Sequence, residues 1–340
     1  MNFFRPLHTF IRTHLPQAKR LLAAALLAAL LGLWMHASGQ YPPYWDAAMT
    51  GLTLLAGLWS PLAAWWLAGL IGLYGLYAFS FYLAVLWMCV LILAQRPASR
   101  HLALAALLLA APFLTRWHLG WLPLLLGGLY LGHSGGAWLG ALSALWGMMV
   151  AAAHGYMPDW LTFAAAPWQA ELVAARFTGL NSWRTLYALI EPLAPNSTAL
   201  LYHLLQVGVW MGAGMLVGYA VQKASKGGRP TEILPITLGG AASLGILQGL
   251  LALWLGVHPW GWFVSQKSSL LLPMLIAPLA ATWLDILRDF FGRPLPPAPS
   301  HQKRSNAPLV SPQISPNLLP KSPKPEKNDD ESDLIMLELD

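Results

Sequence analysis

Charged side chains are scarce in this sequence. Only 10% of its 340 residues are Asp, Glu, Lys or Arg, whereas 56% are hydrophobic. A soluble domain carries about 25% charged residues, which cover its surface with groups that water solvates. The single cysteine excludes a disulfide scaffold, and the abundance of apolar residues excludes a chain that is disordered throughout. These absences leave one fold class, an all-α polytopic helical transmembrane bundle.

Two long stretches contain no charged residue at all, one between Asp46 and Arg96 and the other between Arg116 and Asp159. A helix needs about 20 apolar residues to cross a bilayer, because its backbone amides must be paired internally in the hydrocarbon. Each stretch is long enough for two crossings. Shorter hydrophobic segments complete a bundle predicted over residues 21–291: Leu21–Ala37, Leu102–Thr115, Ala199–Val221, Ile233–Val257 and Ser269–Leu284.

Lys and Arg residues cluster beside these segments, and basic loops stay on the cytoplasmic side of a membrane. One cluster lies in a basic N-terminal segment, residues 1–20, and three follow it: Arg5, Arg12, Lys19 and Arg20; Arg96 and Arg100; Lys223, Lys226 and Arg229; Arg288, Arg293, Lys303 and Arg304. We therefore expect an integral protein of a bacterial cytoplasmic membrane, surrounded by the lipid bilayer, with both termini in the cytoplasm. The net charge of +6 follows from this topology and predicts no nucleic-acid partner.

The number of crossings depends on residues 47–94, which must contribute one or three if the N-terminal segment and Arg96 lie on the same side. These 48 residues are generous for one crossing and short for three, at about 1.5 Å per residue. We expect one full span plus a re-entrant half-helix, broken near Ser60-Pro61, which gives about eight crossings in total. Ten crossings with short helices are the alternative.

The one long loop expected on the outer side covers residues 155–197. Within it, an apolar stripe at helical spacing predicts a helix that lies on the membrane surface or caps the bundle. The stripe consists of Trp183, Leu186, Tyr187, Leu189 and Ile190.

The composition changes at residue 292. Ten prolines fall between Pro294 and Pro325, which predicts a disordered cytoplasmic tail over 292–340. The last fifteen residues hold seven of the fourteen acids, and they frame an apolar patch of Leu334, Ile335, Met336, Leu337 and Leu339. Such a patch can dock on a partner. We expect a non-enzymatic membrane component of a larger assembly that recruits a cytosolic or membrane protein through this tip; a chain end that binds nothing is the alternative.

Glycines recur at helical spacing in two of the hydrophobic segments. Small residues four apart let another membrane helix approach closely. The sequence therefore predicts helix-packing seams at Gly128, Gly132, Gly136 and Gly140, and again at Gly208 and Gly212.

Polar groups inside the hydrophobic segments are few, and they are functional candidates because they are costly in lipid. His203 and Gln206 lie on one segment and Gln248 on the next. They predict either hydrogen bonds between helices or a solute-binding site in a permease-like subunit energised by another component. Because no carboxylate lies at mid-span, a transporter powered by its own ion coupling is not expected. No metal site or cofactor is expected either.

Gly132-His133-Ser134-Gly135 resembles the G-x-S-G active-serine motif of rhomboid intramembrane proteases. The resemblance covers about five residues. It implies Ser134 as nucleophile and His203, followed by Gly208 and Gly212, as its partner. The His-x-x-x-Asn pair of that family is absent from the earlier segments, so a hydrolase remains the remote alternative to a non-enzymatic protein.

Overall fold

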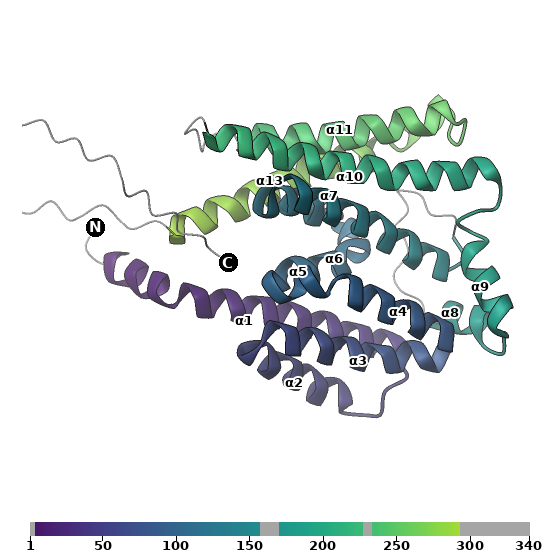
Figure 1. Cartoon of the computed structure of the whole chain (residues 1–340), viewed down its shortest axis with the longest axis horizontal. Helices are drawn as coiled ribbons and strands as arrows, with labels where there is room; N and C mark the ends of the chain where they lie inside the picture. The colour runs from purple at the N-terminus through teal and green to yellow at the C-terminus, as the bar shows by residue number, and fades with distance from the viewer. Residues whose placement is uncertain (1–3, 157–169, 227–232, 293–340) are drawn as a thin grey trace, which may run out of the picture. The chain divides into compact units, whose positions relative to one another are not determined.

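The computed structural model describes residues 4–156, 170–226 and 233–292, and every regular element in these ranges is helical (Figure 1). The elements are α1 (Phe4–Ser38), α2 (Trp45–Trp59), α3 (Pro61–Phe79), α4 (Phe81–Leu93), α5 (Gln95–Arg100), α6 (Leu102–Leu114), η1 (Thr115–Trp117), α7 (Leu122–Ala153), α8 (Ala170–Phe177), α9 (Ser182–Ile190), α10 (Ser197–Lys226), α11 (Ile233–Trp254), α12 (Trp260–Ser265) and α13 (Lys267–Gly292). The chain divides into a unit of residues 1–295 and a second of 296–340. The predicted tail and its docking tip lie outside the described residues.

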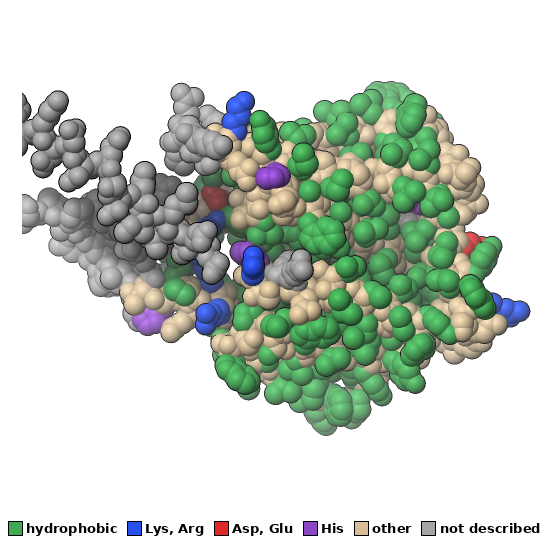
Figure 2. Space-filling view, viewed as in Figure 1, with side chains coloured by type: hydrophobic (Ala, Val, Ile, Leu, Met, Phe, Trp, Pro, Cys, Tyr) green, Lys and Arg blue, Asp and Glu red, His purple; other side chains and the backbone are tan. Residues whose placement is uncertain are grey.

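Six of the described helices are long and apolar enough to cross a membrane: Thr13–Ser38, Pro61–Phe79, Leu122–Ala153, Ser197–Ala224, Ile233–Trp254 and Lys267–Phe291. Exposed hydrophobic side chains are spread over the whole helical surface on the face shown in Figure 2, and Lys and Arg lie toward the helix ends. A soluble protein does not expose apolar surface on this scale. The chain is therefore a multi-pass helical membrane protein.

Residues 45–93 fold differently from the single span and half-helix predicted. They form three helices, α2, α3 and α4, with breaks at Ser60 and Ser80. Successive helices are antiparallel, since a Cβ on Gly57 would touch Ala24 and Ala64, and the Trp87 indole donates to the Gly69 carbonyl over 2.8 Å. The break near Ser60-Pro61 was predicted, whereas the break at Ser80 was not.

Helix α7 consists of two antiparallel arms rather than one straight helix. Gly132 has φ 72° and ψ −164°, a conformation that glycine adopts without steric cost. The chain reverses there, because Gly136 lies beside Gly128 and Gly140 beside Leu124. The first arm, residues 122–131, is about 15 Å long at 1.5 Å per residue, which is half of the span predicted for it.

The second arm of α7, residues 133–153, packs directly against the backbone of α10. A Cβ on Gly136 would collide with the Gly214 carbonyl oxygen, and one on Gly140 would collide with that of Trp210. Gly218 meets Gly132 in the same way. This glycine seam thus joins α7 to α10 through Gly214 and Gly218.

Gly208 and Gly212, for which the same role was predicted, have nothing within 4 Å of their Cβ positions. No described helix packs against these two glycines, so their packing role stays a prediction.

The predicted outer loop contains the short helices α8 and α9. Leu189 of α9 is buried with Val173 and Phe177 of α8 against the ends of α3 and α7, at Phe79 and Ala153. The rest of the predicted stripe is exposed: Trp183, Leu186, Tyr187 and Ile190. Helix α9 thus caps one end of the bundle with one face and presents aromatic side chains on the other.

The glycine seam leads to a first prediction. Gly136→Ala places a methyl group against backbone atoms that cannot turn away, so it should lower the free energy of unfolding by about 1–3 kcal/mol. Denaturant unfolding in detergent micelles measures this loss. Gly212→Ala is the matched control, because its methyl group meets nothing within 4 Å and should be neutral or stabilising by up to about 1 kcal/mol. Equal effects from the two variants would contradict the seam.

Candidate functional site

A cavity of about 990 Å³ opens between α1, α3, α4, α6, η1, α7 and the start of α13. This volume is at the upper end of the range of about 300–1,000 Å³ found for ligand pockets. Its described lining is mostly leucine, alanine, glycine and six tryptophans: Trp34, Trp65, Trp87, Trp117, Trp121 and Trp146. The cavity is the strongest candidate for a binding site in the described part of the chain.

Tryptophan indoles hold the walls of the cavity together. Trp65 Nε1 donates to the Leu91 carbonyl (3.1 Å), Trp87 Nε1 to Gly69 (2.8 Å) and Trp146 Nε1 to Leu109 (3.0 Å). Each bond joins two helices and satisfies the one polar atom of a large apolar ring. The rings are therefore fixed, and those of Trp87 and Trp146, which are half-buried, keep carbon surface toward the cavity.

Tyr41, between α1 and α2, anchors the wall formed by α3. Its hydroxyl donates to the Ile71 carbonyl over 2.7 Å and accepts from the Gly75 amide over 3.1 Å. Burial raises the pKa of Tyr41, so the hydroxyl keeps the proton that it donates.

The cavity has an apolar deep end. Along α1 it is lined from Leu26 to Ala37 and along α3 from Trp65 to Leu76, which is about 16 Å on either helix at 1.5 Å per residue. Leu27 and Trp65 at the deep end are almost completely buried, as is Leu91 beside them.

The opposite end of the cavity is its mouth and carries the polar groups. Leu33, His36, Arg116 and Trp117 are exposed there, and His118 is half-buried. His36 stands in the last turn of α1. The polarity of the lining therefore changes from one end of the cavity to the other.

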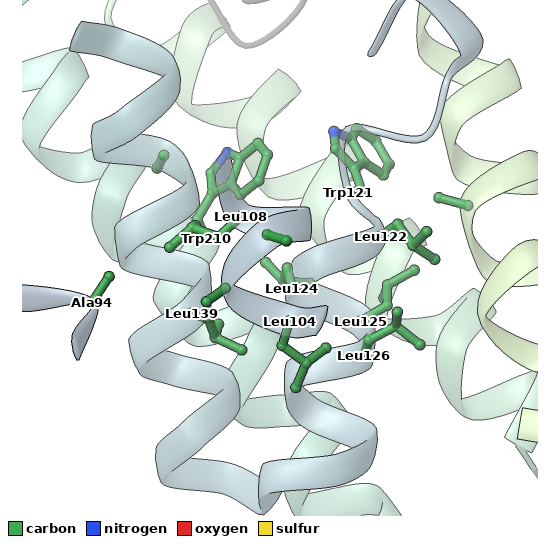
Figure 3. Close-up of a cluster of buried hydrophobic side chains, with 14 of the residues drawn as sticks. Ala94, Leu104, Leu108, Trp121, Leu122, Leu124, Leu125, Leu126, Leu139 and Trp210 are labelled. Carbon is green, nitrogen blue, oxygen red and sulfur yellow. The ribbon is translucent and has the colours of Figure 1, made fainter. Parts of the chain in front are cut away.

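A helical hairpin carries Arg116 to the mouth. It consists of α6, η1, a turn through Trp121 and the first arm of α7. Leu104 and Leu108 of α6 and Leu124 of the first arm pack in one buried cluster with Leu139 of the second arm and Trp210 of α10 (Figure 3).

The two ends of this hairpin lie together. The Arg288 guanidinium is 4.5 Å from the Tyr130 ring at the end of the first arm. Its charge also interacts electrostatically with His101, which precedes α6. Burial, Arg100 and Arg288 lower the pKa of His101. We call this end of the unit the Arg288 end; His36 and the mouth lie toward the opposite end, the His36 end.

The turn at the tip of the hairpin is sharply folded. His118 has φ 61°, Thr115 Oγ1 donates to the Pro112 carbonyl over 2.7 Å, and the Leu119 amide donates to the Leu114 carbonyl over 3.0 Å. These local bonds fix the backbone that bears Arg116.

Charge at the mouth has one sign. The titratable groups among the described lining residues are Arg116, His36 and His118, and no acid is found among them. Within the described ranges, no hydrogen bond or ion pair reaches the Arg116 guanidinium. An unpaired guanidinium beside apolar walls can bind an anion.

The polar residues predicted as a solute site lie elsewhere. His203 is buried and its Nδ1 lies 2.6 Å from the Leu193 carbonyl. Gln206 and Gln248 are completely buried, and both of their amides lack a hydrogen-bond partner in the described part of the chain, as does the Ser143 hydroxyl. None of these residues lines the cavity. Gln206 and Ser143 share one level of the α7–α10 interface, since they lie one turn beyond Trp210 and Gly140 respectively.

The structure keeps Ser134 apart from His203. Gly132 contacts Gly218 and Gly136 contacts Gly214, so Ser134 lies opposite residue 216 of α10. His203 is thirteen residues away on that helix, about 20 Å along its axis. A nucleophile and its base must lie within hydrogen-bond reach, and this pair does not.

Sequence reasoning missed Arg116-Trp117-His118. The signal was present, because a lone arginine separates two hydrophobic segments in which no other residue from 102 to 153 carries a full charge. A lone arginine between two hydrophobic segments is also typical of a loop that joins two spans, so the pattern did not mark a site.

Comparison with known proteins adds no identification: no family model, curated protein or solved structure matches the chain.

The buried amides generate a second prediction. Gln206→Leu removes an amide without a described partner, so it should stabilise the protein by about 1–3 kcal/mol, which is the cost of an unsatisfied buried polar group. Unfolding in micelles measures the change. Gln222→Leu is the control, because this exposed amide meets His133 at 3.1 Å and its loss should not stabilise. Destabilisation by Gln206→Leu would show that the amide has a bound partner.

Proposed function

We propose that this membrane protein binds a lipid-like amphiphile in the tryptophan-lined cavity, in a binding or transport role rather than in catalysis. The observation that carries the proposal is the polarity of the cavity, which is apolar at its deep end and polar at its mouth. An amphiphile matches both ends, whereas a polar solute would have to shed its water against leucine and tryptophan. This keeps the predicted solute-binding role but moves it from His203, Gln206 and Gln248 to the cavity.

We further propose eight crossings: six by the long helices α1, α3, the second arm of α7, α10, α11 and α13, and two by the short helices α2 and α4, with 15 and 13 residues, together with the residues that flank them. The hairpin of α6 and the first arm would enter and leave on one side, because its two ends lie together near Arg288. Arg100, Lys223 and Arg288 adjoin elements at the Arg288 end, which supports a cytoplasmic location for that end. Both termini would then be cytoplasmic, in a bacterial cytoplasmic membrane, with the mouth on the outer side.

A second candidate function is the recruitment of a protein partner through the tail. Its support is the sequence alone: an apolar patch of Leu334–Leu337 and Leu339 framed by acids after a proline-rich stretch. Because the patch lies outside the described residues, this role stands beside the cavity proposal and does not depend on it.

Filling the cavity tests the first function. Gly72 lines it, and a Cβ there would sit 3.6 Å from the Trp87 ring, so Gly72→Leu directs new side-chain volume into the space. Native mass spectrometry of the detergent-purified protein with 1-oleoylglycerol should show a bound lipid in the unmodified chain and roughly tenfold weaker binding in the variant. Gly51→Leu on α2, where nothing lies within 4 Å, should bind normally. No lipid binding by the unmodified chain would refute the function.

Removing the tip tests the second function. Full-length protein purified gently from its native membranes should retain a specific partner, and deletion of Glu326–Asp340 should abolish the co-purification. A variant with serine at residues 334–337 and 339 keeps every acid and should also lose the partner. If both altered chains retain it, the tip is not the docking site.

A further inference from the structure

We infer that the amphiphile carries an anionic headgroup, a phosphate ester or a carboxylate, bound by Arg116 at the mouth of the cavity. The inference rests on the proposed function and names the class of ligand. It begins with the charge at the mouth, where Arg116, His36 and His118 stand without an acid among the described lining residues.

Arg116 itself points to an anion. An ionisable group inside the hydrocarbon is costly, and it ordinarily pairs with an opposite charge or serves a site. Arg116 has no such pairing among the described residues, although a hydrogen-bonded turn holds its backbone in place. A guanidinium presents parallel N–H donors that match two oxygens of a phosphate or carboxylate. The missing partner is therefore the headgroup of the ligand.

The histidines complete the headgroup site. His118 follows Arg116 on the same turn, and His36 reaches the mouth from α1. Each imidazole can donate a hydrogen bond to an anionic oxygen, whether it is neutral or protonated. No other titratable group among the described lining residues faces this end.

The length of the cavity agrees with a lipid chain. It extends about 16 Å from the mouth to Trp65 and Leu26, and one leaflet of a bilayer is about 15 Å of hydrocarbon. A headgroup on Arg116 thus leaves the acyl chain lying along α1 and α3, between the tryptophan rings. A small phosphate ester without a chain would leave this apolar surface empty.

Binding of matched ligands tests the inference. The purified full chain is titrated with 1-oleoylglycerol 3-phosphate, 1-oleoylglycerol, glycerol 3-phosphate and inorganic phosphate, and bound species are counted by native mass spectrometry. The phosphate-bearing lipid should bind most tightly. Arg116→Gln should weaken it roughly 10- to 100-fold, the value of a charged hydrogen-bonded pair, and leave 1-oleoylglycerol unchanged. Arg116→Lys, which keeps the charge but not the fork, should be intermediate.

Arg184→Gln is the matched control, because it removes an exposed arginine of α9 that does not line the cavity; it should bind all four compounds as the unmodified chain does. Equal binding of the two lipids, or an Arg116→Gln variant with full preference for the phosphate, would overturn the inference and leave the proposed function intact. Glycerol 3-phosphate binding as tightly as the lipid would overturn the assignment of a lipid. Failure of both lipids to bind the unmodified chain would overturn inference and function together.

Discussion

Direct backbone contact between α7 and α10 fixes much of the helical unit. Lipid gives no hydrophobic drive for helices to associate, so close packing must supply the attraction. Glycines on both helices allow carbonyl groups to approach where side chains would separate them, as at Gly136 and Gly214. Because Gly132 reverses the chain beside Gly218, the same contact turns the first arm of α7 back toward α6. The seam thus determines where the hairpin that bears Arg116 can lie.

The cavity depends on a different kind of interaction. A void inside a bundle forfeits dispersion contacts along its walls, so the surrounding helices tend to collapse into it. Here Trp65, Trp87 and Trp146 join helix pairs through hydrogen bonds to backbone carbonyls, and each carbonyl has a second lone pair for such a bond. These cross-links resist collapse without filling the space. A ligand that restores the lost contacts would stabilise the fold that binds it.

The sequence predicted the class of the protein because uncharged runs of such length have no stable place in water. It also located the break at Ser60-Pro61, where proline begins a helix. The break at Ser80 was not predicted, because Phe81–Leu93 continues the same apolar run and 48 residues are short for three full-length spans. The structure fits them by making α2 and α4 short, with 15 and 13 residues.

The glycine spacing in α7 predicted close contacts at these residues but not the reversal of the chain at Gly132. Gly128, Gly136 and Gly140 do meet close neighbours, yet a four-residue repeat reads the same in a straight helix and in two antiparallel arms. Only the positive φ of Gly132 distinguishes the two, and a sequence does not display a dihedral angle. The site at Arg116 was hidden for a related reason: a tip that turns back within the bundle has the same local sequence as a loop that leaves it.

Under the proposed function, the arrangement of charge and apolar surface would make the cavity selective from both ends. A ligand with no charge would leave the Arg116 guanidinium unpaired, and a ligand with no hydrocarbon would leave the half-buried lining of the cavity, such as Leu26 and Trp87, without contacts. Each mismatch costs free energy independently, since the two regions are separated by most of the length of α3 that lines the cavity. Discrimination then depends on a molecule that satisfies both regions at once and at the right separation. The hairpin of α6 and the first arm of α7 sets this separation, because it holds Arg116 at a fixed distance from the apolar deep end of the cavity.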